Sequence, residues 1–298
     1  MYTPPIAPGR AFLVCLGHRT LSLITQMLST HTIAVIGAGN IGRALIGGLV
    51  NGHAFEPDQL WATRRNSVAL DELGSDFPGI RTTTKNPEAV AFASIVILAI
   101  KPQNVHDVLE DIREHVSEKT LVISVLAGIT TDALQQGLGR DVAIVRTMPN
   151  TPALVDEGAT AIVGGRFSTS EQVVLARHIF EAVGKVEIVS EDLMDAVTGL
   201  SGSGPAYVYM FIEALTDAGV KQGIPRPIAA RLAAQTVYGA SKLAIETGKH
   251  PAILRDEVTT PGGTAIAAVA ELEAHGLRTM LINAVATATA RSKELSES

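Results

Sequence analysis

Cysteine is almost absent from this chain, whose 298 residues include one, Cys15. A single thiol excludes an internal disulfide framework and a metal site built from several thiolates. Because scarce cysteine fits a reducing compartment, we expect a cytoplasmic protein. The eight histidines are scattered without the spacing of metal ligands, so we expect no metal.

Aromatic residues and excess positive charge are also scarce. Phe, Trp and Tyr make up 4% of the chain, and the formal net charge at pH 7 is -6. No basic cluster with interleaved aromatics stands out, which argues against a nucleic-acid partner. The apolar run over residues 11–17 is too short to span a membrane, so no membrane partner is expected. By contrast, 46% of the residues are apolar, enough for the cores of two globular domains.

The first residues differ in character from the rest of the chain. Arg10 ahead of the apolar run would suit a cleaved export signal, whereas His18 and Arg19 interrupt that run. We favour a disordered or mis-assigned leader over residues 1–28, with Met27 as the natural start. The cleaved signal stays open as the alternative.

The most informative stretch is the apolar run Ile33–Ile36, which continues into a G-x-G-x-x-G pattern at residues 37–42 and then into helically spaced apolar residues. This order predicts a strand, a tight turn and a helix. The first glycine permits the turn, the second lets a pyrophosphate approach the backbone, and the third lets helix and strand pack closely. Small residues placed for packing alone are the alternative. The residues expected at the dinucleotide are Gly37, Ala38, Gly39, Asn40, Ile41 and Gly42.

Strand-like runs alternate with helical segments as far as about residue 190. The predicted strands are 33–36, 59–62, 94–100, 120–125, 142–146, 160–163 and 186–189, and the predicted helices 68–74, 86–92, 104–115, 130–138 and 169–183. This alternation predicts an α/β fold with a Rossmann-type, parallel-sheet NADP-binding domain over residues 29–190. From Glu191 onward the apolar residues recur only at helical spacing, so we expect an all-helical domain over residues 191–298 that forms an oligomer interface.

Ligands of parallel sheets bind beyond the carboxyl ends of the strands, so the residues after each run are candidate contacts. Arg64 and Arg65 follow the second run, where an NAD-specific protein would place an acidic residue. Guanidinium groups match the 2′-phosphate of NADP, so we expect NADPH as the cofactor and NADH as a weaker one. Two solvated surface arginines are the alternative. Lys101-Pro102 and Ala127-Gly128 follow later runs and are expected to line the same groove.

Two further turns are marked by proline, and the second also contains two glycines. Asn150 lies between two prolines and is expected either to contact the cofactor, to cap a helix, or to serve the turn alone. In the second turn, we expect Thr260 as the N-cap and Pro261 as the first residue of a helix. The N–H groups of Gly262, Gly263 and Thr264 would then be free to bind a carboxylate. An ordinary helix start is the alternative.

Together these motifs resemble the pyrroline-5-carboxylate reductase family over about residues 32–295. The motifs are Gly37–Gly42, Ala99–Gln103, Met148–Pro152, Asp195–Tyr207, Asp217–Lys221 and Val258–Gly263. The Ser-Gly-Pro-Ala-Tyr and Pro-Gly-Gly blocks are specific in combination. The resemblance implies hydride transfer from NADPH to the C=N carbon of 1-pyrroline-5-carboxylate, which gives L-proline in the last step of proline synthesis. It also implies a helical domain that interlocks with its partner in a homodimer, stacked in some members into a larger ring such as a decamer.

The resemblance assigns site residues by matching position. Those for the cofactor are the glycine loop, Arg64, Arg65, Asn86, Ala99, Ile100, Lys101, Pro102, Ala127 and Gly128. Those for the substrate are Glu191, Thr198, Thr260, Gly263, Thr264 and Ala265, with Thr264 and Thr198 as the candidate catalytic hydroxyls. Many members carry a second threonine where this chain has Ala265, so either Thr264 supplies the hydroxyl near the ring nitrogen or that contact is absent.

The chemistry itself needs no strong general acid. A cyclic imine is basic enough to arrive protonated or to take a proton from a hydroxyl or water, and the protein then mainly positions its reactants. Two rival functions remain. A β-hydroxyacid oxidoreductase would need a lysine base at helical spacing to an asparagine, a pair not found between residues 195 and 220. An NADP-binding regulatory protein would share the glycine loop without needing a carboxylate site.

Overall fold

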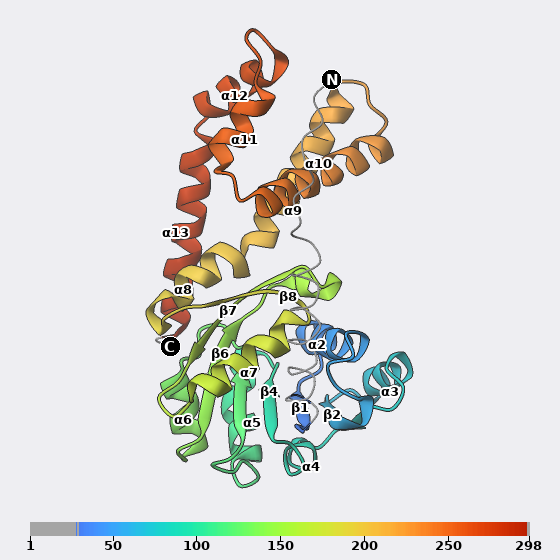
Figure 1. The fold of residues 1–298 in the computed structure, drawn as a ribbon, viewed down its shortest axis with the longest axis vertical. Helices are drawn as coiled ribbons and strands as arrows, with labels where there is room; N and C mark the ends of the chain where they lie inside the picture. Colours follow the sequence, from blue (N-terminus) through green and yellow to red (C-terminus); the bar gives the residue numbers. More distant parts are fainter. Residues whose placement is uncertain (1–27, 29, 297–298) are drawn as a thin grey trace, which may run out of the picture. The chain divides into compact units, whose positions relative to one another are not determined.

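The computed structural model describes Leu28 and residues 30–296, so the predicted leader lies outside the described residues apart from Leu28. An eight-stranded sheet with the order β3-β2-β1-β4-β5-β6-β7-β8 organises the first part of the chain (Figure 1). Its strands are β1 (Ile33–Ile36), β2 (Leu60–Thr63), β3 (Arg81–Thr83), β4 (Ile95–Leu98), β5 (Leu121–Ser124), β6 (Ala143–Met148), β7 (Gly158–Gly164) and β8 (Gly184–Ile188). The order reverses direction between β1 and β4, which is where ligands bind in sheets of this kind.

Neighbouring strands are parallel except for β6 and β7, which pair antiparallel. A parallel pair needs a long crossover, whereas β6 and β7 are joined by a turn and the short 3-10 helix η3 (Thr151–Val155). The sequence predicts both strands but not this reversal. It also misses β3, because Arg81–Thr83 is a short, polar strand at the sheet edge and lacks the apolar run that marks the others.

Helices cover both faces of the sheet (Figure 1). Alternate strand residues point to opposite faces, so Ile33 and Val35 join one apolar core while Ala34 and Ile36 join the other. Three helices, α2 (Asn40–Asn51), α3 (Ser67–Asp76) and α7 (Ser170–Glu181), contribute to the first core. Three more, α4 (Asn86–Val90), α5 (Val105–Ile112) and α6 (Thr131–Leu138), contribute to the second. This arrangement confirms the predicted Rossmann-type fold.

No strand follows β8 in the described residues. The later helices are α8 (Met194–Val197), the π-helix η5 (Thr198–Gly202), α9 (Gly204–Lys221), α10 (Arg226–Thr247), α11 (Pro251–Val258), α12 (Thr264–Ala274) and α13 (Leu277–Ser296). These elements confirm the all-helical character predicted for the second part. The remaining 3-10 helices are η1 (Pro57–Gln59), η2 (Pro102–Asn104) and η4 (Glu191–Leu193).

The chain divides into two compact units. The helical unit is Ser203–Arg291. The sheet unit consists of the chain up to Gly202 together with the residues from Ser292 onward. Glu191–Gly202 therefore groups with the sheet, and the domain boundary predicted between residues 190 and 191 stays a prediction. Among the helices of residues 28 and 30–296, none combines the length and apolar character needed to cross a membrane.

Candidate active site

The glycine loop lies at the switch point of the sheet, between the ends of β1 and β2 and beside the end of β4. The N–H groups of Gly37 and Ala38 donate to the carbonyl oxygen of Thr63, at 3.1 and 2.8 Å. These bonds tie the loop to the last residue of β2. The loop then enters α2, whose N-cap is Gly39 and whose first turn holds no acidic side chain. The N-terminus of α2 is thus open to an anion.

Each glycine of the loop meets the need that the sequence predicts for it. Gly37 has a φ of +87°, and a Cβ there would lie 2.6 Å from Ile100 Cγ2, so the turn requires glycine. At Gly42 a Cβ would lie 3.0 Å from Val35 Cγ1, where helix and strand pack closely. A Cβ at Gly39 would have no neighbour within 4 Å. The backbone at Gly39 is therefore the one that a pyrophosphate can approach.

A cavity of about 420 Å³ adjoins this loop and brings together many of the predicted cofactor residues. Its predicted lining residues are Gly37, Gly39, Arg64, Arg65, Asn86, Ala99, Ile100 and Lys101. Three of them carry positive charge, which suits a ligand with several phosphates. The exposed Arg64 and Arg65 follow directly on β2, so their side chains are available to a ligand at this strand end.

Thr63 links the loop to Asn86 through its side chain. The Gly37 N–H donates to Thr63 Oγ1 at 3.3 Å, and Thr63 Oγ1 donates to Asn86 Oδ1 at 2.7 Å. Asn86 Nδ2 in turn donates to Asp111 Oδ2 at 3.0 Å. The chain of bonds holds Asn86, the first residue of α4, beside the cavity.

The sequence misses four residues that line this cavity, which are Thr63, Asn66, Asn104 and Val108. Asn66 caps α3 by accepting from the Ala69 N–H at 3.2 Å, so the motif Arg-Arg-Asn at a strand end contained a signal for it. The predicted cofactor residues outside the cavity lining are Ala38, Asn40, Ile41, Gly42, Pro102, Ala127 and Gly128. Their assignment stays a prediction.

The Pro-Gly-Gly stretch corrects the sequence-based expectation. Thr260 is not an N-cap and Pro261 is not helical, because α12 begins at Thr264 with Gly263 as its N-cap. The Gly263 N–H donates to the Thr260 carbonyl oxygen at 2.9 Å, and Gly262 takes a φ of +68°. Proline followed by a glycine of positive φ is the signature of a type II turn, which competes with a helix start in the same residue pattern.

The turn changes which N–H groups are available. Gly263 uses its N–H within the turn, so it is not the free donor that the sequence predicts. By helix geometry, the N–H groups of Thr264, Ala265 and Ile266 have no carbonyl partner within α12. Thr264 is exposed and Gly263 carries no side chain over this end. The helix N-terminus therefore still suits a carboxylate, with the donors moved toward the helix.

Two other predicted substrate residues lie in the sheet unit. Glu191 Oε1 accepts from the buried Arg146 guanidinium at 2.7 Å, and its two carboxylate oxygens lie 3.4 and 3.3 Å from the N and Oγ1 of Thr131. Thr198 Oγ1 donates to the Met194 carbonyl oxygen at 2.9 Å, so the hydroxyl keeps only its capacity to accept. Asn150 donates to the Ser201 carbonyl oxygen and accepts from the Ala159 N–H, so its amide links the turn after β6 to η5 and β7 and does not cap η3.

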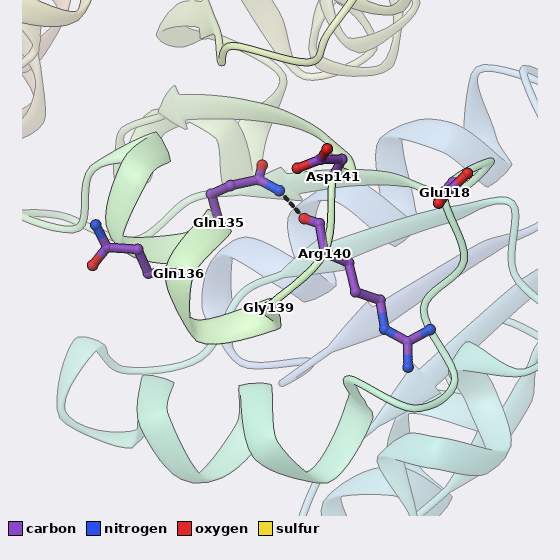
Figure 2. Close-up of a pocket in the computed structure, with 6 residues that line it drawn as sticks. All are labelled: Glu118, Gln135, Gln136, Gly139, Arg140 and Asp141. Carbon is purple, nitrogen blue, oxygen red and sulfur yellow. Dashed lines mark hydrogen bonds between the residues drawn. The ribbon is translucent and has the colours of Figure 1, made fainter.

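A second hollow, of about 550 Å³, lies near the opposite ends of the strands, where β5 and β6 begin (Figure 2). Its lining residues are Glu118, Gln135, Gln136, Gly139, Arg140 and Asp141. Figure 2 shows Gln135 donating to the Arg140 carbonyl oxygen, and the Arg140 guanidinium is paired with Glu114. Because cofactors bind at carboxyl ends, this hollow is no candidate for the dinucleotide. No three His, Cys, Asp or Glu side chains within the described part of the chain could hold a metal ion.

Two family models match the chain. Residues 32–128 match the model described as NADP oxidoreductase coenzyme F420-dependent, and residues 191–295 match pyrroline-5-carboxylate reductase dimerisation. A glycine loop at the switch point of a Rossmann-type sheet, followed by such a helical region, defines a pyridine-nucleotide oxidoreductase.

Individual relatives of known sequence and structure identify the family within this class. The chain is 41% identical to the pyrroline-5-carboxylate reductase of Escherichia coli strain K12 over 89% of this chain and 98% of that protein. It is 44% identical to the one from Synechocystis, over 88% and 97%. A solved pyrroline-5-carboxylate reductase from Coxiella burnetii shares the fold with a TM-score of 0.86, at 39% identity over 91% of this chain and 100% of that one. The chain belongs to the pyrroline-5-carboxylate reductase family.

Proposed function

We propose that this chain reduces 1-pyrroline-5-carboxylate to L-proline with NADPH, the last step of proline biosynthesis. The observation that carries the proposal is the cavity beside the glycine loop, where Gly39, the Arg64–Arg65 pair and Asn86 meet in a member of this family. Bound NADPH supplies the hydride that the C=N carbon of the substrate accepts. The roles of the protein are to bind both molecules and to provide for the proton on the ring nitrogen.

The cofactor residues fit NADPH in shape and charge. The open backbone at Gly39 accommodates a pyrophosphate at the N-terminus of α2. Arg64 and Arg65 offer fork-shaped donors to the 2′-phosphate, which NADH lacks, so we expect NADPH to be preferred and NADH to be used less well. A related solved structure, the pyrroline carboxylate reductase of Plasmodium falciparum, is described with NADP bound and is 29% identical over 90% of this chain and 99% of that one, with a TM-score of 0.81.

The substrate residues divide between carboxylate binding and hydroxyl contacts. The first-turn N–H groups of α12 bind the substrate carboxylate, with the type II turn over Thr260–Gly263 holding the helix end in place. Thr264 offers an exposed hydroxyl next to these donors, and Ala265 contributes only its backbone and methyl group. The Thr198 hydroxyl donates its hydrogen bond to the Met194 carbonyl oxygen, so toward the iminium N–H it acts as an acceptor unless that bond breaks.

The helical unit forms the subunit interface. In Ser203–Arg291 the buried residues are Thr216, Ala229 and Ala233, whereas many large apolar side chains are exposed. The exposed ones on α9, α10 and α13 include Val208, Met210, Phe211, Leu215, Leu232, Leu243, Met280 and Ile282. A unit with so little interior needs a partner to cover its apolar surface. We expect a homodimer in the cytoplasm, with a larger ring such as a decamer as the alternative assembly.

The test is NADPH oxidation by the purified chain with 1-pyrroline-5-carboxylate, run beside NADH and beside a 3-hydroxy acid with NADP. Turnover of the imine with NADPH preferred is the expected result. NADPH binding without imine turnover would leave the cofactor site intact and refute the proposed reaction. Turnover of the hydroxy acid instead would favour the rival oxidoreductase.

A further inference from the structure

The segment from Glu191 to Gly202 connects the last strand to α9 and carries Thr198. It folds as η4, α8 and the π-helix η5, and its buried residues are Gly199 and Met194, which packs with Ala161 and Val163 of β7 in a small apolar cluster. π-Helical turns are rare and occur often at functional sites. The hydroxyls of Thr198 and Ser201 bond back to carbonyls within the segment, so they do not attach it to the sheet. The position of Thr198 must therefore be set by contacts at other residues.

Arg146 holds the beginning of the segment. Its side chain is 4% exposed and lies at the carboxyl half of β6, where its guanidinium meets Glu191 Oε1 at 2.7 Å. A buried guanidinium needs an opposite charge, so this pair resists separation. Glu191 is also within hydrogen-bond distance of Thr131, the first residue of α6. The first residue of the segment is thus fixed to two elements of the sheet unit.

Asn150 holds the end of the segment. It lies in the turn that follows β6, and its side-chain Nδ2 donates to the Ser201 carbonyl oxygen at 3.1 Å. Its Oδ1 accepts from the Ala159 N–H at 2.9 Å, which fixes the orientation of the amide. A Cβ at Gly202 would lie 2.5 Å from Cε of Met148, which comes between Arg146 and Asn150 in the sequence, so the end of the segment packs closely against this strand end. One strand end therefore holds both ends of the segment.

We infer that Arg146 and Asn150 are positioning residues, which fix the segment that carries Thr198 at both of its ends. The inference rests on the proposed function, in which Thr198 contacts the imine. Neither residue touches the cavity beside the glycine loop. Loss of either anchor should therefore misplace Thr198 while cofactor binding stays intact, because small misplacements of reacting groups lower rates steeply.

The decisive variant is Asn150→Asp, which keeps the acceptor for Ala159 and replaces the donor to Ser201 with an oxygen of nearly the same size. Arg146→Met removes the positive charge from the other anchor. Arg146→Lys keeps a positive charge but lacks the fork-shaped set of guanidinium donors. We expect kcat for the imine to fall by about 10- to 100-fold in Asn150→Asp and Arg146→Met. Arg146→Lys should recover part of the loss. The dissociation constant for NADPH should stay at the wild-type value in all three.

The deuterium isotope effect on kcat, measured with NADPH deuterated at the transferred position, separates positioning from stability. A smaller folded fraction lowers kcat but leaves KM and the isotope effect unchanged, whereas a misplaced substrate slows hydride transfer and raises the isotope effect. Thr169→Ala is the matched control, because it removes one side-chain to backbone bond at the N-cap of α7, away from the proposed site. Its KM and isotope effect should equal those of the wild type. Unchanged values in Asn150→Asp and Arg146→Met would overturn the inference.

Hydrogen exchange of the backbone amides in residues 191–202 tests the two anchors without an activity assay. Exchange there should accelerate in both variants, while the glycine loop keeps its protection. Unchanged exchange over residues 191–202 would overturn the inference. A wild-type chain that does not turn over the imine would refute the proposed function, and the anchors would then be judged on exchange alone.

Discussion

Replacing Gly39 by alanine separates cofactor binding from folding. Apart from its chain neighbours, a Cβ at this residue meets no atom within 4 Å, and the backbone φ of -83° suits alanine. Alanine is a poorer N-cap than glycine but loses less chain entropy on folding, so the free energy of unfolding should stay within about 1 kcal/mol of the wild type. The methyl group takes the space proposed for the pyrophosphate, which costs about 1–3 kcal/mol of binding free energy. The dissociation constant for NADPH should rise about 5- to 150-fold.

Gly37→Ala is the matched comparison in the same loop. Its Cβ would lie 2.6 Å from Ile100 Cγ2 and 2.9 Å from the Ala99 carbonyl oxygen, at a φ of +87°. Backbone strain and overlap together should lower the free energy of unfolding by about 2–6 kcal/mol. NADPH fluorescence titration measures affinity and urea unfolding measures stability. Wild-type affinity in Gly39→Ala would refute the reasoning, because the pyrophosphate then would not pass over this residue.

Three further predictions concern the phosphate, pH and the turn. The double variant Arg64→Ser/Arg65→Ser should raise KM for NADPH about 10- to 150-fold and leave KM for NADH nearly unchanged; equal changes in initial-rate kinetics would contradict it. Burial lowers the pKa of His31, so the unfolded chain binds more protons as pH falls. Urea unfolding should show stability lost below about pH 6.5, and His31→Gln should flatten that slope. Gly262→Ala strains a φ of +68° by about 1–2 kcal/mol and should raise KM for the imine more than Pro261→Ala does, with NADPH affinity kept in both.

The sequence predicts the sheet well where burial is strong on both faces. The runs at β1, β4 and β5 consist of consecutive buried residues, so their apolar letters alone identify them. The antiparallel direction of β7 depends on the short connection through η3, and the apolar residues of the strand itself do not indicate it. The edge strand β3 is held by pairing with β2, so its polar sequence gives no signal.

The candidate site shows the same division between local and long-range information. The glycine spacing is a local signal, although the close contacts that require Gly37 come from Ala99 and Ile100, which follow β4. The Pro-Gly-Gly stretch is also local, yet the same residues favour a helix start and a type II turn. A helix start would leave these N–H groups free, whereas the type II turn forms a hydrogen bond from the Gly263 N–H to the Thr260 carbonyl oxygen. The structure contains the turn. The sequence therefore indicates this stretch as a candidate carboxylate site, which stays a prediction, but it does not indicate which N–H groups are free.

No local sequence pattern predicts that Arg146 and Glu191 form an ion pair. In the sequence, Arg146 ends an apolar run and looks like the solvated last residue of a strand, whereas in the fold its side chain is 4% exposed. Its partner lies beyond two further strands along the chain, and nothing near either residue indicates the other. A buried charge is costly unless it is paired, so the tertiary structure must bring Glu191 to Arg146. Here the pair fixes Glu191 and with it the start of the segment before α9, so Arg146 acts on the proposed site through Glu191.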